Sequence, residues 1–127
     1  MNKVALITGA TRGIGKQIAL TLAKEQYDIV INYRSENEEL SEVKKEIEAN
    51  NVKCITVKGD VSNFKDCENM IKEAIEEFGQ IDVLVNNAGI TKDTLLMRMT
   101  KDDFEKVINV NLVGTFNMSK NVIPYMM

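Results

Sequence analysis

The 127-residue sequence contains no histidine and no tryptophan, and it has one proline and two cysteines. The cysteines stand at positions 54 and 67 and form no C-x-x-C pair. Because histidines and closely spaced cysteines are the usual ligands of zinc and iron sites, we expect no metal centre. Two unpaired cysteines also favour a reducing compartment, so we expect a cytoplasmic protein.

Long apolar runs and an excess of positive charge are missing as well. No apolar run approaches the ~20 residues that a membrane-spanning helix needs. The formal net charge is −3, whereas proteins that bind a nucleic acid backbone are usually basic. We therefore expect neither a membrane nor a nucleic acid as a partner. Hydrophobic residues make up 44% and charged residues 28%, which is ordinary for one globular domain of this length.

Short apolar runs alternate with amphipathic stretches along the chain. Apolar runs at 4–7, 29–31, 54–57 and 81–85 predict strands that are buried on both faces. Helical spacing appears from residue 13, where Ile14, Ile18 and Leu22 lie four apart, and again at 40–47 and 64–78. A last helix is predicted from Thr100, which can cap it, to about Val122, with Pro124 nearby.

Connections of this length exclude hairpins and predict parallel strands. We therefore expect an α/β fold, a Rossmann-like doubly wound parallel sheet of about four strands in the order 3-2-1-4, with helices on both faces. Gly79 follows the third helix, where a left-handed cap residue is expected. Ligands of such sheets bind at the carboxyl ends of the strands, beside the switch point between the first and fourth strands.

A glycine-rich stretch follows the first strand and opens the first helix. Gly9, Gly13 and Gly15 have the spacing G-x-x-x-G-x-G. Glycine permits a tight turn and a close approach, and free N–H groups at a helix start favour a phosphate group. This context indicates a site for the pyrophosphate of a dinucleotide. The alternative is a tight strand-to-helix turn without a ligand.

The end of the second strand indicates which dinucleotide is preferred. NAD sites usually carry an acidic residue there, but this chain has Asn32-Tyr33-Arg34-Ser35. Arg12 and Arg34 could flank a 2′-phosphate, a group that guanidinium side chains suit. We therefore expect NADP(H) rather than NAD(H). The alternative is that both arginines are simply solvated.

Two motifs together resemble the short-chain dehydrogenase/reductase family: "TGATRGIG" at 8–15 and "NNAG" at 86–89. Within the family, "NNAGITKDTLLMRMT" at 86–100 and "NVNLVGTF" at 109–116 are similar to bacterial 3-oxoacyl-[acyl-carrier-protein] reductases. The resemblance covers all 127 residues but only about the first half of such an enzyme. It implies NADPH-dependent reduction of 3-oxoacyl-[acyl-carrier-protein] to the 3-hydroxyacyl form in fatty-acid synthesis.

The resemblance also implies roles for individual residues, taken motif by motif. The pyrophosphate loop would consist of Gly9, Ala10, Thr11, Arg12, Gly13, Ile14 and Gly15. Arg34 would select the cofactor, Asp60 and Val61 would hold the adenine ring, and Asn87, Ala88 and Gly89 would line the ribose. Asn111 matches the family's helical asparagine, which holds a water molecule in the catalytic proton relay.

The residues themselves support part of this assignment. Asp60 and Asn87 follow apolar strands at the edge where ligands bind, although both residue types also commonly make turns. Asn111 falls on the apolar stripe of Phe104, Val107 and Ile108, so we expect a buried amide that needs hydrogen-bond partners. The alternative is an asparagine bonded to neighbouring backbone, which is partly compatible with the catalytic role.

The family's catalytic serine and its Y-x-x-x-K motif find no match in this chain. Tyr27 and Tyr33 are followed four residues later by Ile31 and Asn37. We therefore expect residues 1–127 to be the amino-terminal nucleotide-binding portion of one reductase domain, with the catalytic half beyond Met127. The rival hypotheses are an NADP-binding half-domain without turnover and a self-associating structural fragment. The many apolar residues at 100–122 favour a homo-oligomer with this helix as its interface.

Overall fold

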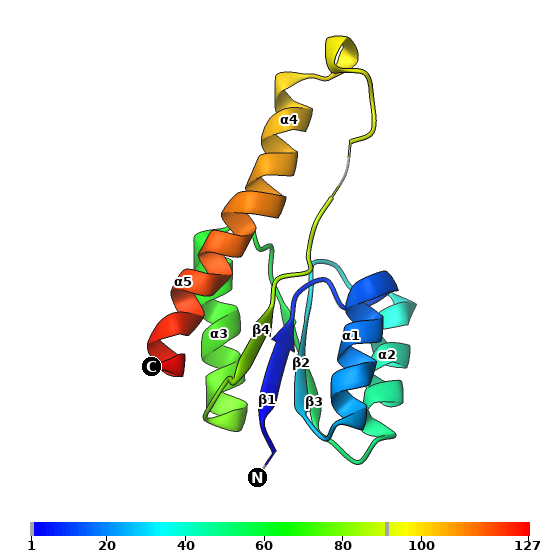
Figure 1. The fold of residues 1–127 in the computed structure, drawn as a ribbon, viewed down its shortest axis with the longest axis vertical. Helices are drawn as coiled ribbons and strands as arrows, with labels where there is room; N and C mark the ends of the chain where they lie inside the picture. The colour runs from blue at the N-terminus through cyan, green and yellow to red at the C-terminus, as the bar shows by residue number, and fades with distance from the viewer. Residues whose placement is uncertain (1, 91) are drawn as a thin grey trace.

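The four apolar runs form one parallel sheet in the computed structural model, which describes residues 2–90 and 92–127. The strands are β1 (Val4–Ile7), β2 (Asp28–Tyr33), β3 (Cys54–Lys58) and β4 (Val83–Val85), in the order β3-β2-β1-β4. Ala5 of β1 pairs with Ile29 on one side and with Val83 on the other. The predicted α/β fold and strand order are therefore confirmed (Figure 1).

Three strands differ from the predicted ranges, and β3 does so only by one residue, since it ends at Lys58 rather than at residue 57. β2 extends beyond 29–31 at both ends, to Asp28 and Tyr33. β4 begins at Val83 rather than at residue 81, and Asp82, just before it, bonds to Val4 through both its main chain and its side chain. Its Oδ2 accepts a hydrogen bond from the N–H of Val4 at 2.8 Å, while Ile81 packs into the core at 2% exposure.

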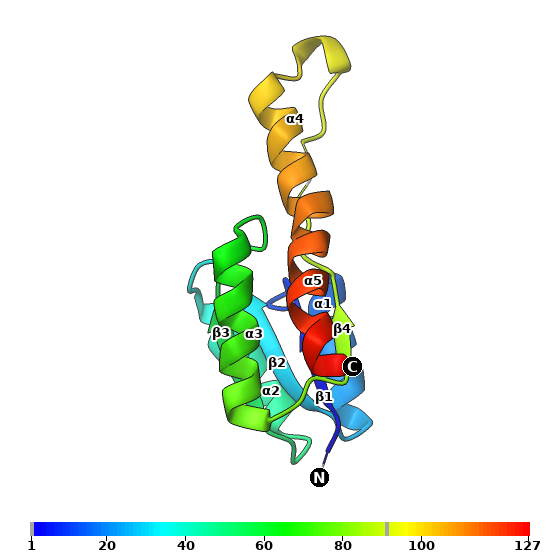
Figure 2. The ribbon, with the colours of Figure 1, turned by 90° about the vertical axis from the view of Figure 1, so that its left-hand side faces the viewer.

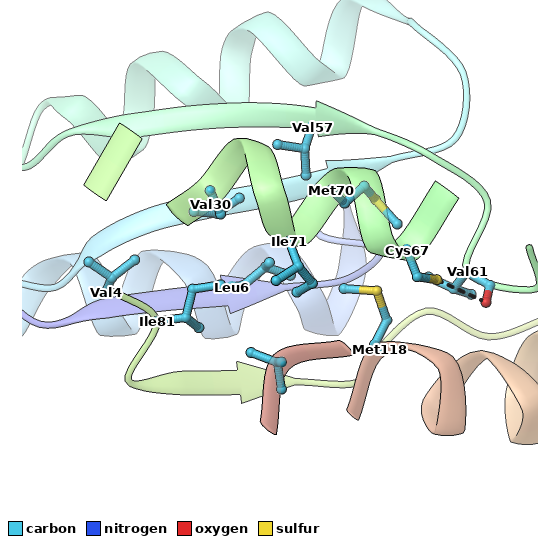
Figure 3. Close-up of a cluster of buried hydrophobic side chains, with 12 residues drawn as sticks. Val4, Leu6, Val30, Val57, Val61, Cys67, Met70, Ile71, Ile81 and Met118 are labelled. Carbon is cyan, nitrogen blue, oxygen red and sulfur yellow. Dashed lines mark hydrogen bonds between the residues drawn. The ribbon is translucent and has the colours of Figure 1, made fainter. Parts of the chain in front are cut away.

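Helices cover both faces of the sheet, as predicted. α1 (Gly13–Lys24) and α2 (Glu38–Glu48) lie on one face, and α3 (Phe64–Phe78) and α5 (Gly114–Met126) lie on the other (Figures 1 and 2). Alternate side chains of each strand point to opposite faces, so each face has its own apolar core. The α3/α5 core includes Leu6, Val30, Val57, Ile71 and Met118 (Figure 3).

α1 contacts the sheet mainly through small residues. The buried positions are Gly15, Ala19 and Ala23, whereas Ile14 is 75% exposed. Small side chains let the helix axis approach the strands, so the larger Ile18 and Leu22 pack only partly at its margins. The helical spacing of Ile14, Ile18 and Leu22 thus predicted the helix, while small residues of the same helix make its closest contacts with the sheet.

Both predicted helix ends with a defined chemistry are confirmed. Thr100 caps α4 (Lys101–Ile108), and its Oγ1 accepts a hydrogen bond from the N–H of Asp103 at 3.0 Å. Gly79 ends α3 in the left-handed region with a φ of 76°. A short 3-10 helix, η1 (Leu96–Arg98), precedes α4.

The last helix contains a wider turn and is not ended by proline. A wider π-helical turn, η2 (Asn109–Val113), separates α4 from α5, and α5 continues through Pro124 to Met126. Proline removes one N–H donor, but helical bonding continues past it, since the N–H of Met127 donates to the carbonyl of Ile123 at 3.1 Å. The predicted end near Val122 is therefore wrong.

α4 projects beyond the sheet, as Figures 1 and 2 both show. None of its described residues is buried, and Phe104 is 55% exposed. Val107 and Ile108 are half-buried. The predicted buried stripe of Phe104, Val107 and Ile108 is therefore wrong for this chain, because the helix has no element of the sheet beneath it.

Candidate cofactor-binding site

A pocket of about 490 Å³ lies at the carboxyl ends of the strands, where the doubly wound topology predicts a ligand. It joins the turn after β1, the end of β2, the turn after β3 and the turn after β4. Most of the predicted cofactor residues line it: Gly9, Thr11, Arg12, Gly13, Arg34, Asp60, Val61, Asn87, Ala88 and Gly89. Residues separated by up to eighty positions in sequence thus meet at one opening.

Four predicted site residues lie outside the pocket wall. Ala10 is buried in the core, and Ile14 is 75% exposed and does not line the pocket. Gly15 packs beneath the loop, where an added Cβ would lie 2.5 Å from the carbonyl oxygen of Gly9 and against the Asn87 amide. Asn111 lies beside the pocket and contacts it through Ile90.

The glycine loop has a backbone that few other residues adopt. Gly9 and Gly13 have φ values of 63° and 62°, in the left-handed region. An added Cβ on Gly9 would lie 3.0 Å from Cα of Ala88, so the loop also passes close to the turn after β4. Within the described chain no side chain caps α1 at Arg12, which leaves the N–H groups of the first turn available to an anion.

Thr8 fastens the turn after β4 to the end of β1. Its Oγ1 accepts hydrogen bonds from the N–H groups of Asn87 at 3.0 Å and of Ala88 at 2.9 Å. Asn87 in turn donates through Nδ2 to the carbonyl of Gly9 at 3.0 Å. Asn87 therefore does shape a turn, and that turn forms the wall of the pocket. Thr8 was not singled out from the sequence, although a polar residue directly after an apolar run was a signal for it.

Asn32, near the end of β2, was also missed as a site residue. It is 3% exposed and lines the pocket, and its Oδ1 accepts a hydrogen bond from the N–H of Gly9 at 3.2 Å. Its Nδ2 donates to the carbonyl of Gly59 at 3.0 Å. The signal was an amide that interrupts the apolar strand sequence, since a buried amide needs partners.

Asp60 is held by the turn after β3. Its Oδ1 accepts hydrogen bonds from the N–H of Ser62 at 2.9 Å and from the hydroxyl of Ser62 at 2.7 Å. Burial raises the pKa of this carboxyl, but the two bonds from Ser62 and the charge of Arg34 outweigh burial, and the pKa lies below its ordinary value. Asp60 is therefore a carboxylate at neutral pH.

The two predicted arginines both line the pocket, at the glycine loop and at the end of β2. Arg34 lies 3.5 Å from Oδ2 of Asp60, measured from its nitrogen Nη2, and its side chain is 70% exposed. An exposed ion pair of this kind contributes at most ~1 kcal/mol, so an incoming anion can compete for Arg34. The pocket thus offers cations and main-chain N–H groups, a donor set that fits a phosphate-bearing ligand.

Asn111 lies in the π-helical turn η2 and is exposed rather than buried, which corrects the prediction. Its Oδ1 accepts a hydrogen bond from the N–H of Ile90 at 2.8 Å, and its Nδ2 donates to the carbonyl of Ile90 at 3.0 Å. The amide therefore finds its partners in the segment after β4. π-helical turns of this kind occur frequently at functional sites.

Six further residues line the pocket that the sequence did not single out: Tyr33, Ser35, Asn37, Gly59, Ile90 and Val110. Asn37 also caps α2, since its Oδ1 accepts a hydrogen bond from the N–H of Leu40 at 3.1 Å. Thr91, inside the 86–100 motif, lies outside the described residues. Among the helices that the structure describes, none has the length and apolar character to cross a bilayer.

Comparison with known proteins gives consistent matches. The sequence model of the family described as "short chain dehydrogenase" matches residues 3–127. The chain is 47% identical over 127 residues to the 3-oxoacyl-[acyl-carrier-protein] reductase FabG of Staphylococcus epidermidis, covering 100% of this chain and 52% of that protein. It is 46% identical to the 3-oxoacyl-[acyl-carrier-protein] reductase of Synechocystis sp., covering 98% of this chain and 51% of that protein.

A solved structure of a Serratia marcescens short-chain dehydrogenase/reductase, a doubly substituted mutant, is similar in fold. Its TM-score is 0.93 at 27% sequence identity, with 98% of this chain and 51% of that chain covered. The chain thus spans about half the length of the relatives that it matches.

Proposed function

Because the chain belongs to the short-chain dehydrogenase family, we propose that it supplies the nucleotide-binding portion of a 3-oxoacyl-[acyl-carrier-protein] reductase. The observation that carries this proposal is 47% identity over the whole chain to a relative of that name. Under this proposal, residues 1–127 are the amino-terminal portion of one reductase domain that works in the cytoplasm. The substrate of the whole protein is a 3-oxoacyl thioester of acyl-carrier protein, reduced to the 3-hydroxyacyl form.

The proposed cofactor is NADP(H), which supplies the hydride when bound. Arg12 and Arg34 line the pocket and would bind the 2′-phosphate, and no acidic residue stands at the end of β2 to favour an unphosphorylated ribose. The glycine loop at 9–15 would hold the pyrophosphate with its main-chain N–H groups. Asp60 and Val61 would bind the adenine ring, and the 87–89 turn would line the ribose.

Asn111 has the proposed catalytic role of holding a water molecule for the proton relay. Its side chain is already bound to Ile90, so the water would lie against its main chain or against the loop that it positions. The residue that donates the proton is not among the 127 residues, since no tyrosine has a lysine four positions later. We therefore propose that this chain on its own binds the cofactor without turnover.

A homo-oligomer is the proposed assembly, with 100–122 as the interface. Large apolar side chains on this segment are exposed, among them Phe104 at 55%, Leu112 at 64% and Phe116 at 58%. Exposed apolar residues gathered on one segment commonly mark a protein contact. Light scattering on the native chain and on the variant Phe116→Asp tests this, and a monomer at all concentrations would contradict it. Self-association that is indifferent to nucleotide would favour the structural fragment instead.

Titration with NADPH and NADH, followed by nicotinamide fluorescence, is the experiment that tests the cofactor proposal. Saturable binding that favours NADPH is the expected result, together with no oxidation of NADPH when a 3-oxoacyl thioester is added. Tighter binding of NADH would contradict the assignment of Arg12 and Arg34. A folded chain that binds neither nucleotide would contradict the binding role and leave a structural fragment.

A further inference from the structure

Two buried asparagines converge on the turn that carries Asp60. In the part of the chain that the structure describes, the buried polar residues are Thr8, Asn32 and Asn117. Thr8 binds the turn after β4, as described above. Asn32 comes from β2 and Asn117 from α5, and both donate to carbonyl groups in the segment 59–61.

Asn117 crosses from α5 to this segment. It is 4% exposed, and its Nδ2 donates to the carbonyl of Val61 at 2.9 Å. Sγ of Cys67 donates to the same carbonyl at 3.3 Å, a contact drawn in Figure 3. The neighbouring Asn121 behaves differently, because its Nδ2 donates at 2.8 Å to the carbonyl of Asn117 in its own helix. A side-chain amide on α5 can therefore find a partner within its own helix, whereas Asn117 binds Val61 in a different segment.

The two amides bracket a single residue. Asn32 binds the carbonyl of Gly59 at 3.0 Å, and Asn117 binds the carbonyl of Val61 at 2.9 Å, so Asp60 lies between two anchored peptide groups. The α5 backbone is also close, because an added Cβ on Gly114 would lie 2.7 Å from Cγ2 of Val61. The position of Asp60 in the pocket therefore depends on β2 and on α5 together.

We propose that Asn32 and Asn117 are positioning residues that hold the 59–61 segment, and that they thereby set the affinity of the pocket for the adenosine end of a nucleotide. The proposal rests on the proposed cofactor function and deepens it. Asn117 acts on this segment alone. Asn32 also binds the N–H of Gly9 at 3.2 Å, so it couples the segment to the glycine loop.

Asn117→Leu is the first test, because leucine keeps the branching at Cγ, although it is larger, and removes the donor. Two ligands separate the ends of the cofactor: 2′,5′-ADP carries the adenosine end, and reduced nicotinamide mononucleotide carries the nicotinamide end. The expected result is an affinity for 2′,5′-ADP lowered about three- to tenfold, as for one lost hydrogen bond, with the mononucleotide affinity unchanged. Asn121→Leu, the same change on the same helix, should alter neither.

Gly114→Ala is the second test, because it pushes on Val61 without removing a hydrogen bond. Alanine favours a helix over glycine, so α5 itself should remain formed. The variant should lower the affinity for 2′,5′-ADP in the same way. The proposal would be overturned if the affinities for 2′,5′-ADP and for the mononucleotide fell equally. It would also be overturned if neither Asn117→Leu nor Gly114→Ala lowered the affinity for 2′,5′-ADP.

Nuclear magnetic resonance of the unliganded chain gives a readout that needs no nucleotide. If Asn117 positions the segment, Asn117→Leu should shift the amide signals of 60–62 and raise the pKa of Asp60 toward its ordinary value, since the contacts with Ser62 loosen. If the native chain bound neither ligand, the cofactor function would fail. The positioning role would then stand if the pKa of Asp60 rises and would fall if it does not.

Discussion

The side-chain amide of Asn111 binds both main-chain groups of Ile90, accepting from its N–H at 2.8 Å and donating to its carbonyl at 3.0 Å. The two residues lie 21 positions apart, one in the π-helical turn and the other in the segment that follows β4. This pairing connects η2, between α4 and α5, to the wall of the pocket.

Replacing Asn111 should loosen this wall in a way that depends on the substitution. Asn111→Leu removes the acceptor of the Ile90 N–H, whereas Asn111→Asp keeps an oxygen in its place. We expect hydrogen exchange at the Ile90 amide to speed up by roughly tenfold in the leucine variant, consistent with ~1 kcal/mol for one hydrogen bond. The aspartate variant keeps the acceptor but loses the donor to the Ile90 carbonyl, so exchange should speed up less than in the leucine variant. Equal exchange rates in both variants would contradict the pairing.

The glycine loop predicts two different costs of adding a methyl group. Gly13→Ala places alanine at a φ of 62° with open space around its Cβ, which should lower the free energy of unfolding by ~1 kcal/mol. Gly9→Ala adds a contact with Ala88 to a similar φ of 63°, and should cost more, about 2–3 kcal/mol. Urea unfolding measures both, and equal losses would show that the loop yields freely at Ala88.

Arg34 should discriminate between the two nicotinamide cofactors. Arg34→Ala is expected to weaken NADPH binding by roughly tenfold, because a charge-assisted bond to phosphate is lost at an exposed site, and to leave NADH binding unchanged. Arg98→Ala removes the same side chain from η1, outside the pocket, and should change neither affinity. Fluorescence titration measures all four affinities. A parallel loss for NADH would assign Arg34 a general role instead.

Asp60 should make the stability of the fold depend on acid pH. Because its pKa is lowered in the folded chain, its carboxylate contributes stability that is fully present above the ordinary value of 3.8. That contribution is lost as the pH falls through the folded pKa. Between about pH 6 and about pH 3, the unfolding free energy of the native chain should therefore fall more than that of Asp60→Asn. Identical pH profiles would show that Ser62 and Arg34 do not stabilise the charge.

Both cysteines should resist modification while the chain is folded. Burial raises the pKa of the Cys54 thiol and of the Cys67 thiol to about 12, with nearby acidic groups adding to the effect. Since the thiolate is the reactive form, labelling by a disulfide reagent near pH 8 should be slow in buffer and fast in denaturing urea. Rapid labelling of the folded chain at either position would mean that the core opens there.

Much of this fold follows from patterns of a few residues. Continuous apolar runs predicted all four strands, and the alternation with helices predicted their order, because handedness and connection length leave few topologies. Local chemistry predicted the cap at Thr100 and the left-handed Gly79. The predicted cofactor residues that follow the four strands line one pocket, because the carboxyl ends of parallel strands share one edge of the sheet.

The mispredicted residues have a common physical cause. Their neighbours in space come from parts of the chain that are distant in sequence. Asn32 lines the pocket and bonds to Gly9 and Gly59. The residues next to it in sequence do not indicate either partner. Asn111 is exposed because α4 projects past the strands. The roles assigned to individual cofactor residues remain predictions.

The number of residues in the π-helical turn η2 determines which way the side chains beyond it point. Each residue of a regular helix rotates the next side chain by about 100°, so one residue accommodated in a wider turn changes the phase of everything beyond it. Asn111 inside the turn thereby faces the segment after β4, while Asn117 beyond it faces the turn after β3. Deleting one residue of 109–113 other than Asn111 would leave both amides chemically intact and still turn one of them away from the segment that it binds.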